Sequence, residues 1–236
     1  MRIHADFSLP ALVFPAQQQW VPSPQAGVER VMLDRIGEEK ARATSLVRYA
    51  PNSFFPAHEH PEGEEILVLA GVFCEGDLRH GAGSYLRNPP GSKHQPFTDE
   101  GALLFVKLRQ MQPTEQETLA VATTNAEHWQ QEGNIRRCPL FADAHERVEL
   151  IELAANSPWH LTLAKGAELL ILQGELIAET QDLPSQVFST VRLPDQPITR
   201  QTFPCQTWAR FPRGPDMQVS AGANGVQFYL KTGHLA

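Results

Sequence analysis

Three histidines and a glutamate in the first half of the chain have the types and the spacing of a metal-binding set. They are His58, His60, Glu64 and, further along, His94. Imidazole nitrogens and a carboxylate oxygen suit a divalent transition ion such as Fe, Mn, Ni or Zn. Four protein ligands leave one or two coordination positions open, so a further molecule can bind to the ion. The sequence therefore predicts a metal site at these four residues.

Short strands and tight turns are expected to bring these side chains together. Alternate residues of a strand point to one face, so His58 and His60 share a face. The Pro-Glu-Gly sequence after His60 predicts a turn, and residues 64–70 are rich in aliphatic side chains, as in a returning strand. The return strand places a carboxylate opposite the histidines. Glu64 and Glu65 are both candidates, because the alternation of faces does not carry reliably through a turn.

The fourth candidate ligand comes from a different part of the chain. The sequence Asn-Pro-Pro-Gly at residues 88–91 is a strong turn signal, and it places His94 on a separate hairpin. A metal held by two hairpins would stabilise the sheet as well as act in it. Glu62, Glu65 and Lys93 flank the set, but flanking charges are usually solvated, so no catalytic residue is assigned beyond the ligands.

These residues fall into two motifs that resemble those of the cupin superfamily. The first motif, Gly-x5-His-x-His-x3,4-Glu-x6-Gly, is matched by His58, His60, Glu64 and Gly71. The second, Gly-x5-Pro-x-Gly-x2-His-x3-Asn, is matched by Gly83, Pro89, Gly91 and His94. Within the motif, the six-residue gap before Gly71 selects Glu64 over Glu65. Asn52 stands in place of the first glycine and Thr98 in place of the final asparagine, and neither is a ligand.

Within the superfamily, the chain resembles the cupin-like domain of ChrR-type anti-sigma factors. The resemblance covers residues 15–110 and is carried by residues 20–28, 63–73 and 85–92. It implies a sensing role in the response to reactive oxygen, with zinc in the site. The subfamily also resembles small Fe(II) dioxygenases, such as acetylacetone-cleaving enzymes. ChrR-type proteins grip their sigma factor with a helical module bearing an H-x3-C-x2-C signature, which residues 1–19 do not contain, so direct sigma-factor binding is not expected.

The composition indicates a folded, strand-rich protein. The 236 residues are 42% hydrophobic, which supports a substantial core. Nineteen prolines and sixteen glycines fit many short strands better than long helices. A net charge of −7 argues against direct binding to nucleic acid, which requires a basic face.

The three cysteines, Cys74, Cys138 and Cys205, are isolated and odd in number. Without a C-x-x-C pair, neither a thioredoxin motif nor a cysteine zinc site is available. No signal peptide is evident, and no apolar run approaches the eighteen residues of a membrane span. We therefore expect a cytoplasmic protein without a membrane segment.

The second half of the chain repeats the first. Residues 168–174 echo residues 65–71, and residues 208–214 echo residues 85–91. We therefore predict an all-β protein with two antiparallel jelly-roll (cupin) barrels in tandem. The expected parts are a metal-binding, ChrR-like domain at residues 1–111, a linker at 112–128, and a degenerate cupin domain at 129–236.

The second copy has no metal ligands at the corresponding positions. These positions hold Leu161, Leu163, Ala167 and Met217, in the order of His58, His60, Glu64 and His94. The first two shift by one residue if the Asn-Ser pairs at 52–53 and 156–157 are aligned, but no ligand set remains in either alignment, and His160 is a lone histidine. We expect a filled core, with an apolar ligand pocket as the alternative. About twenty extra residues between Gly174 and Gly214, including 182–184 and 193–195, are expected to form a hairpin or loop.

Three functions fit these residues. The first is a sensing cupin, with zinc favoured and Fe, Mn or Ni possible, that responds to a small molecule or oxidant at the metal. The second is an Fe(II)-dependent dioxygenase acting on a small diketone-like or phenolic substrate. The third is a structural bicupin whose metal only ties strands together. Exposed sheet edges in such barrels also favour pairing with another sheet, either within the chain or in a homodimer.

Overall fold

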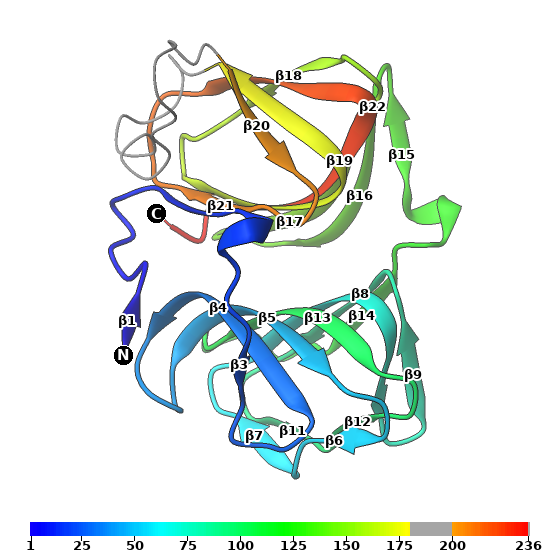
Figure 1. Ribbon diagram of the computed structural model, residues 1–236. Coiled ribbons are helices and arrows are strands. Elements are labelled where there is room, and N and C mark those ends of the chain that lie inside the picture. Colours follow the sequence, from blue (N-terminus) through cyan, green and yellow to red (C-terminus); the bar gives the residue numbers. More distant parts are fainter. Residues whose placement is uncertain (180–199, 236) are drawn as a thin grey trace. The chain divides into compact units, whose positions relative to one another are not determined.

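The computed structural model describes residues 1–179 and 200–235, and these residues form strands almost throughout (Figure 1). The described chain divides into two compact units. The first contains residues 1–5 and 19–126, and the second contains residues 6–18 and 127–236. Only two short 3-10 helices occur in the described ranges, η1 (Pro15–Gln17) and η2 (Ala126–His128). No helix in these ranges is long and apolar enough to cross a membrane.

The first unit is a set of antiparallel strands. Its strands are β1 (Arg2–Ile3), β3 (Val21–Pro22), β4 (Val28–Ile36), β5 (Arg42–Tyr49), β6 (Ser53–Phe54), β7 (His58–His60), β8 (Glu64–Glu75), β9 (Leu78–Gly81), β10 (Ser84–Asn88), β11 (Ser92–His94), β12 (Pro96–Thr98), β13 (Ala102–Leu108) and β14 (Leu119–Ala122). The main sheet has the order β1-β4-β5-β13-β8-β10-β14, and β7 pairs separately with β11.

Apolar side chains on the inner faces of these strands form the core of the first unit. The strands alternate inward aliphatic and outward polar residues, as expected for a sheet with one buried face. The core cluster includes Val28, Tyr49, Ile66, Val68, Phe73, Leu86, Leu104 and Val106. The two-stranded β7–β11 ribbon, which is separate from the main sheet, carries the three predicted histidine ligands.

The second unit repeats this arrangement. Its strands are β2 (Ala11–Val13), β15 (Gln130–Glu132), β16 (Ile135–Ala142), β17 (Arg147–Leu153), β18 (Pro158–Leu161), β19 (Ala167–Glu179), β20 (Arg200–Pro204), β21 (Trp208–Phe211) and β22 (Met217–Thr232). The sheet order is β15-β16-β17-β22-β19-β21-β2. The order β16-β17-β22-β19-β21 matches β4-β5-β13-β8-β10 of the first unit, which confirms the all-β, antiparallel jelly-roll fold in both halves.

Two segments lie elsewhere than the expected domain ranges would place them. Strand β2 pairs with β21, so residues 6–18 belong to the second unit although they precede most of the first. Strand β14 pairs with β10 inside the first unit, although it falls in the expected linker. Strand β14 thus forms one edge of the first sheet, and strand β2 forms one edge of the second. Of the expected extra hairpin, residues 182–184 and 193–195 lie outside the described residues.

Two motif positions have clear backbone reasons. Gly71 has a φ of 73°, and a Cβ built there would clash with the carbonyl oxygen of Gly101. Only glycine fits at that close approach. Asn52, which replaces the first glycine of the motif, has a φ of 57°. Asparagine tolerates this left-handed conformation better than most residues, so the departure from the motif leaves the turn intact.

Candidate metal centre

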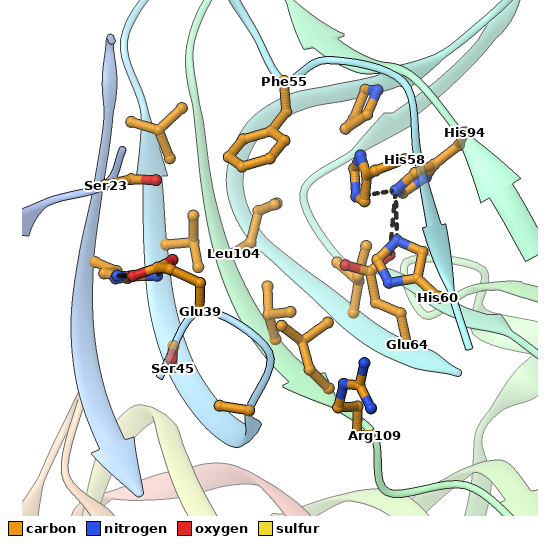
Figure 2. Close-up of a pocket in the computed structure, with 18 of the residues that line it drawn as sticks. Ser23, Glu39, Ser45, Phe55, His58, His60, Glu64, His94, Leu104 and Arg109 are labelled. Atoms are coloured by element: carbon orange, nitrogen blue, oxygen red, sulfur yellow. Dashed lines mark hydrogen bonds and ion pairs between the residues drawn. The ribbon is translucent and has the colours of Figure 1, made fainter. Parts of the chain in front are cut away.

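The three predicted histidines converge on one point. His58 and His60 lie on the same face of β7, and His94 on β11 pairs with His58 across the ribbon. The Nε2 atom of His94 lies 2.8 Å from Nε2 of His60 and 3.2 Å from Nε2 of His58. Figure 2 shows the three rings facing one another at one wall of a cavity. These three residues could therefore bind a metal ion.

Glu64, at the start of β8, lies beside two of these histidines. Its Oε2 atom lies 3.3 Å from Nε2 of His60 and 3.5 Å from Nε2 of His94. Glu65 points to the other face of the strand, where its carboxylate lies 3.2 Å from the guanidinium of Arg87. The structure thus brings Glu64, and not Glu65, to the three histidines.

The donor atoms have separations that a single ion requires. Ligands about 2.1 Å from a common ion lie about 3.0 Å apart at right angles and about 3.4 Å apart at the tetrahedral angle. His94 lies 2.8 Å from His60 and 3.2 Å from His58, and Glu64 lies 3.3 Å from His60 and 3.5 Å from His94, so these four separations span this range. Three neutral nitrogens and one carboxylate oxygen also suit a divalent transition ion. The residues present fit such an ion.

Hydrogen bonds from the opposite ring nitrogens hold two of the histidines in orientation. Nδ1 of His58 lies 2.7 Å from the carbonyl oxygen of Pro56, and Nδ1 of His94 contacts the carboxylate of Glu75. A proton on Nδ1 satisfies both acceptors and leaves the lone pair of Nε2 facing the centre. Such outer contacts fix the tautomer of metal-binding histidines.

Glu75 and its neighbours were not predicted from the sequence. Asn88 lies between the two carboxylates, with its Nδ2 atom 3.4 Å from Glu64 and 3.5 Å from Glu75. Nε2 of His80 lies 3.6 Å from the other oxygen of Glu75. Asn88 opens the Asn-Pro-Pro-Gly turn, and this turn signal does not indicate a contact with either carboxylate. These contacts orient the side chains of Glu64 and His94.

Burial shifts the pKa values of these side chains in the absence of metal. It lowers the pKa of His58, and together with the charges of His94 and His58 it lowers the pKa of His60 to about 3. Burial raises the pKa of Glu64 to about 7. For His94 burial also lowers the pKa, but the hydrogen bond to Glu75 and the charge of Glu64 outweigh it, so the net shift is upward.

The charged residues that flank the ligands in sequence point away from the centre. Lys93 pairs with Glu59 at 3.4 Å, and both are exposed. Glu62 is exposed and pairs with Arg109. These contacts agree with the expectation that Glu62 and Lys93 are solvated, but the expectation is wrong for Glu65, which is buried and paired with Arg87. They do not supply a general base at the ligand atoms.

The four candidate ligands lie at the wall of a cavity of about 510 Å³. This volume is within the range of small-molecule sites. Figure 2 shows Phe55 and Leu104 beside the histidines, and Ser23, Glu39 and Ser45 at the opposite wall. The apolar part of the lining consists chiefly of Val47, Phe55, Ile66, Phe73, Leu104 and Val106. A small organic molecule can therefore lie beside a bound ion.

The corresponding positions in the second unit are packed with aliphatic side chains. Leu161 pairs with Met217 between β18 and β22, as His58 pairs with His94 between β7 and β11. This register settles the one-residue choice in favour of Leu161. Leu161, Leu163, Ala167 and Met217 are all at most 2% exposed and belong to one core cluster. His160 is exposed and contacts Gln218. The second barrel thus has a filled interior at this level.

Comparison with known proteins supports the fold. Residues 9–112, less than half of the chain, match the family model of the ChrR cupin-like domain. YlbA from E. coli has a TM-score of 0.66 at 16% identity, over 97% of this chain and 93% of that one. A candidate dioxygenase from Nostoc punctiforme has a TM-score of 0.65 at 14% identity, over 94% and 78%.

A mutant of oxalate decarboxylase from Bacillus subtilis is a third structural match. It has a TM-score of 0.64 at 10% identity and covers 94% of this chain and 76% of its own. Curated proteins gave no match. At these identities the structural matches establish the fold alone. The chain therefore has the fold of the cupin superfamily, and its residues 9–112 are similar to the ChrR cupin-like domain.

Proposed function

We propose that the first unit binds one divalent transition ion through His58, His60, Glu64 and His94, and that a small organic molecule binds beside it. One observation carries this proposal. The converging ligand atoms lie at the wall of a cavity of about 510 Å³ with a largely apolar lining. A metal that only tied strands together would need no such space.

The reaction that this geometry supports best is oxygen-dependent cleavage of a small diketone-like or phenolic substrate. When bound, Fe(II) would supply activation of dioxygen and polarisation of the substrate oxygens. The chain itself orients the substrate against Phe55 and Leu104 and excludes water from the ligand side of the cavity. Asn88 and Glu75 hold Glu64 and His94 in place.

A sensing role is the second candidate, because residues 9–112 match the ChrR cupin-like domain. In this case the favoured ion is Zn, which has no redox chemistry of its own and prefers four ligands. A small molecule or oxidant that displaces a ligand would then change the β7–β11 ribbon rather than be turned over. No sigma-binding role is proposed.

Oxygen uptake distinguishes the two candidates. The protein is loaded with Fe(II) under dioxygen and supplied with small diketones and phenols, and the Zn form and His60→Ala serve as inactive controls. Sustained uptake with Fe(II) that is absent from both controls supports the enzyme. No uptake, together with a ligand-dependent shift in the melting temperature of the Zn form, rejects catalysis and supports sensing.

A further inference from the structure

The cavity beside the histidines has a second polar end. Arg30 and Arg35 on β4, and Lys40 in the turn that follows, all contribute to its lining. Arg30 lies 3.1 Å from the carboxylate of Glu39, which Figure 2 places across the cavity from His94, with Leu104 between them. The cavity is thus polar at two opposite ends and apolar in the middle.

The positive charge at this end is not fully compensated. Arg35 is only 3% exposed, and its one hydrogen bond among the described residues goes to the backbone carbonyl of Glu38. The Nε atom of Arg30 is buried and has no hydrogen-bond partner in the same ranges. Three cationic groups therefore lie near two carboxylates, those of Glu39 and Glu38, and Glu38 is also paired with the N-terminal amine.

The Arg35 guanidinium lies in an unfavourable environment when no further anion is present. Burial, and then the neighbouring charge of Arg30, lower the pKa of the Arg35 guanidinium. Two guanidinium groups that repel each other in a desolvated place become favourable neighbours when an anion lies between them. A guanidinium also has planar donors that match a carboxylate in two parallel hydrogen bonds. The site therefore has the chemistry of a carboxylate subsite.

We propose that the molecule bound in this cavity carries a carboxylate, and that Arg30 and Arg35 bind this carboxylate at the end of the cavity opposite the histidines. Its other end carries oxygen atoms for the metal, and a short apolar segment lies between them against Val47, Leu104 and Val106. The substrate class is then a small organic acid rather than a neutral diketone. The metal-facing half of this assignment rests on the proposed function, whereas the arginine half does not.

Calorimetric titration of the Zn-loaded protein tests the assignment without turnover. The probes are a β-diketone with a carboxylate three methylene groups away, its methyl ester, and its phosphonate analogue. We expect the acid to bind about tenfold more tightly than the ester, as for hydrogen bonds to a charged group. Arg35→Gln and Arg30→Gln should each remove most of this preference and leave the affinity for the ester unchanged.

Arg48→Gln is the matched control, because Arg48 is an exposed arginine on β5 that pairs with Glu29. It should keep the full preference for the acid. Circular dichroism checks that Arg35→Gln is folded. Arg30 is partly exposed, so Arg30→Gln tests the same preference at a position where replacement disturbs the fold less. Equal binding of acid and ester by the wild-type protein, or tighter binding of the phosphonate, would overturn the carboxylate assignment.

A parallel titration without Zn separates the two proposals. If Zn leaves the affinity for the ester unchanged, the metal-based function fails while the acid–ester difference still supports the arginine subsite. If Zn strengthens binding of acid and ester equally and no difference remains between them, the subsite fails and the metal-based function stands.

Discussion

The carboxylate of Glu75 contacts Nδ1 of His94, on the side of the ring opposite the Nε2 atom that faces His58 and His60. The contact places the ring proton on Nδ1 and keeps the lone pair of Nε2 available. Glu75 ends the same strand, β8, that Glu64 begins. One strand thus supplies a candidate ligand at one end and the group that orients another ligand at the other.

Glu75→Gln should weaken metal binding about 10- to 100-fold, the usual cost of losing such an outer partner. The amide oxygen still accepts a hydrogen bond from His94, but it lacks the charge that makes the imidazole more basic. Competition with a chromogenic chelator measures the affinity. Glu59→Gln is the control, since Glu59 lies between the two histidines in sequence but is exposed and pairs with Lys93. Equal affinities of the two variants would remove Glu75 from the metal centre.

His60→Ala should bind no metal and should lose the stabilisation that metal confers on the wild-type protein. A metal at about 1,000 times its dissociation constant adds about 4 kcal/mol to the free energy of unfolding. Elemental analysis and thermal melting with and without Zn check this result. His160→Ala, at an exposed histidine of the second unit, should behave as the wild type. About two metals per chain would contradict the assignment of a single site.

Glu64→Gln should change how the stability of the metal-free protein depends on pH. The pKa of Glu64 is raised to about 7 from the ordinary 4.5, so between these values the folded state binds a proton that the unfolded state has lost. The stability contributed by this group is therefore complete below pH about 4.5 and is lost as the pH rises to about 7. Replacement by glutamine should remove this loss.

The size of the effect follows from the shift. Over the whole interval, the wild-type protein should lose about 3 kcal/mol relative to Glu64→Gln. His60 acts in the opposite direction, because its lowered pKa makes the stability rise between about pH 3 and 6.5. The variant should therefore become more stable with rising pH in this range. Denaturant titrations at several pH values measure the difference, and parallel curves for both proteins would contradict a buried Glu64.

Leu161→Ala should destabilise the protein without changing its metal content. The side chain is 1% exposed within the core of the second unit, and such truncations cost about 2–5 kcal/mol. The melting temperature and elemental analysis of the same preparation provide the two measurements. A change in metal stoichiometry would show that the second barrel takes part in metal binding.

The ligand set could be predicted from the sequence because its members are close to turns. Two histidines two residues apart must share a face of a strand, and the Asn-Pro-Pro-Gly turn fixes where the hairpin bearing His94 begins. The choice between Glu64 and Glu65 needed the motif. The structure gives the physical reason, since Glu65 forms an ion pair with Arg87 on the other face of the strand.

Glu75 could not be found by the same reasoning. It lies an odd number of residues after Glu64 on one strand, so simple alternation would place the two on opposite faces. A bulge intervenes, since Leu104 pairs with Val68 but Leu103 pairs with Ala70, which leaves Leu69 extra. The inward face therefore changes from even to odd positions, and Phe73 joins Ile66 in the core. A bulge is set by the tertiary fold and has no reliable local signal.

The exchange of strand β2 into the second unit has a consequence for the order in which the protein can fold during synthesis. Residues 11–13 leave the ribosome long before their partner β21 (Trp208–Phe211) is made. The first barrel can assemble while the chain is still growing, but β2 cannot pair until β21 has been synthesised. Until then residues 11–13 must stay accessible, so an early segment of this sequence joins its sheet late.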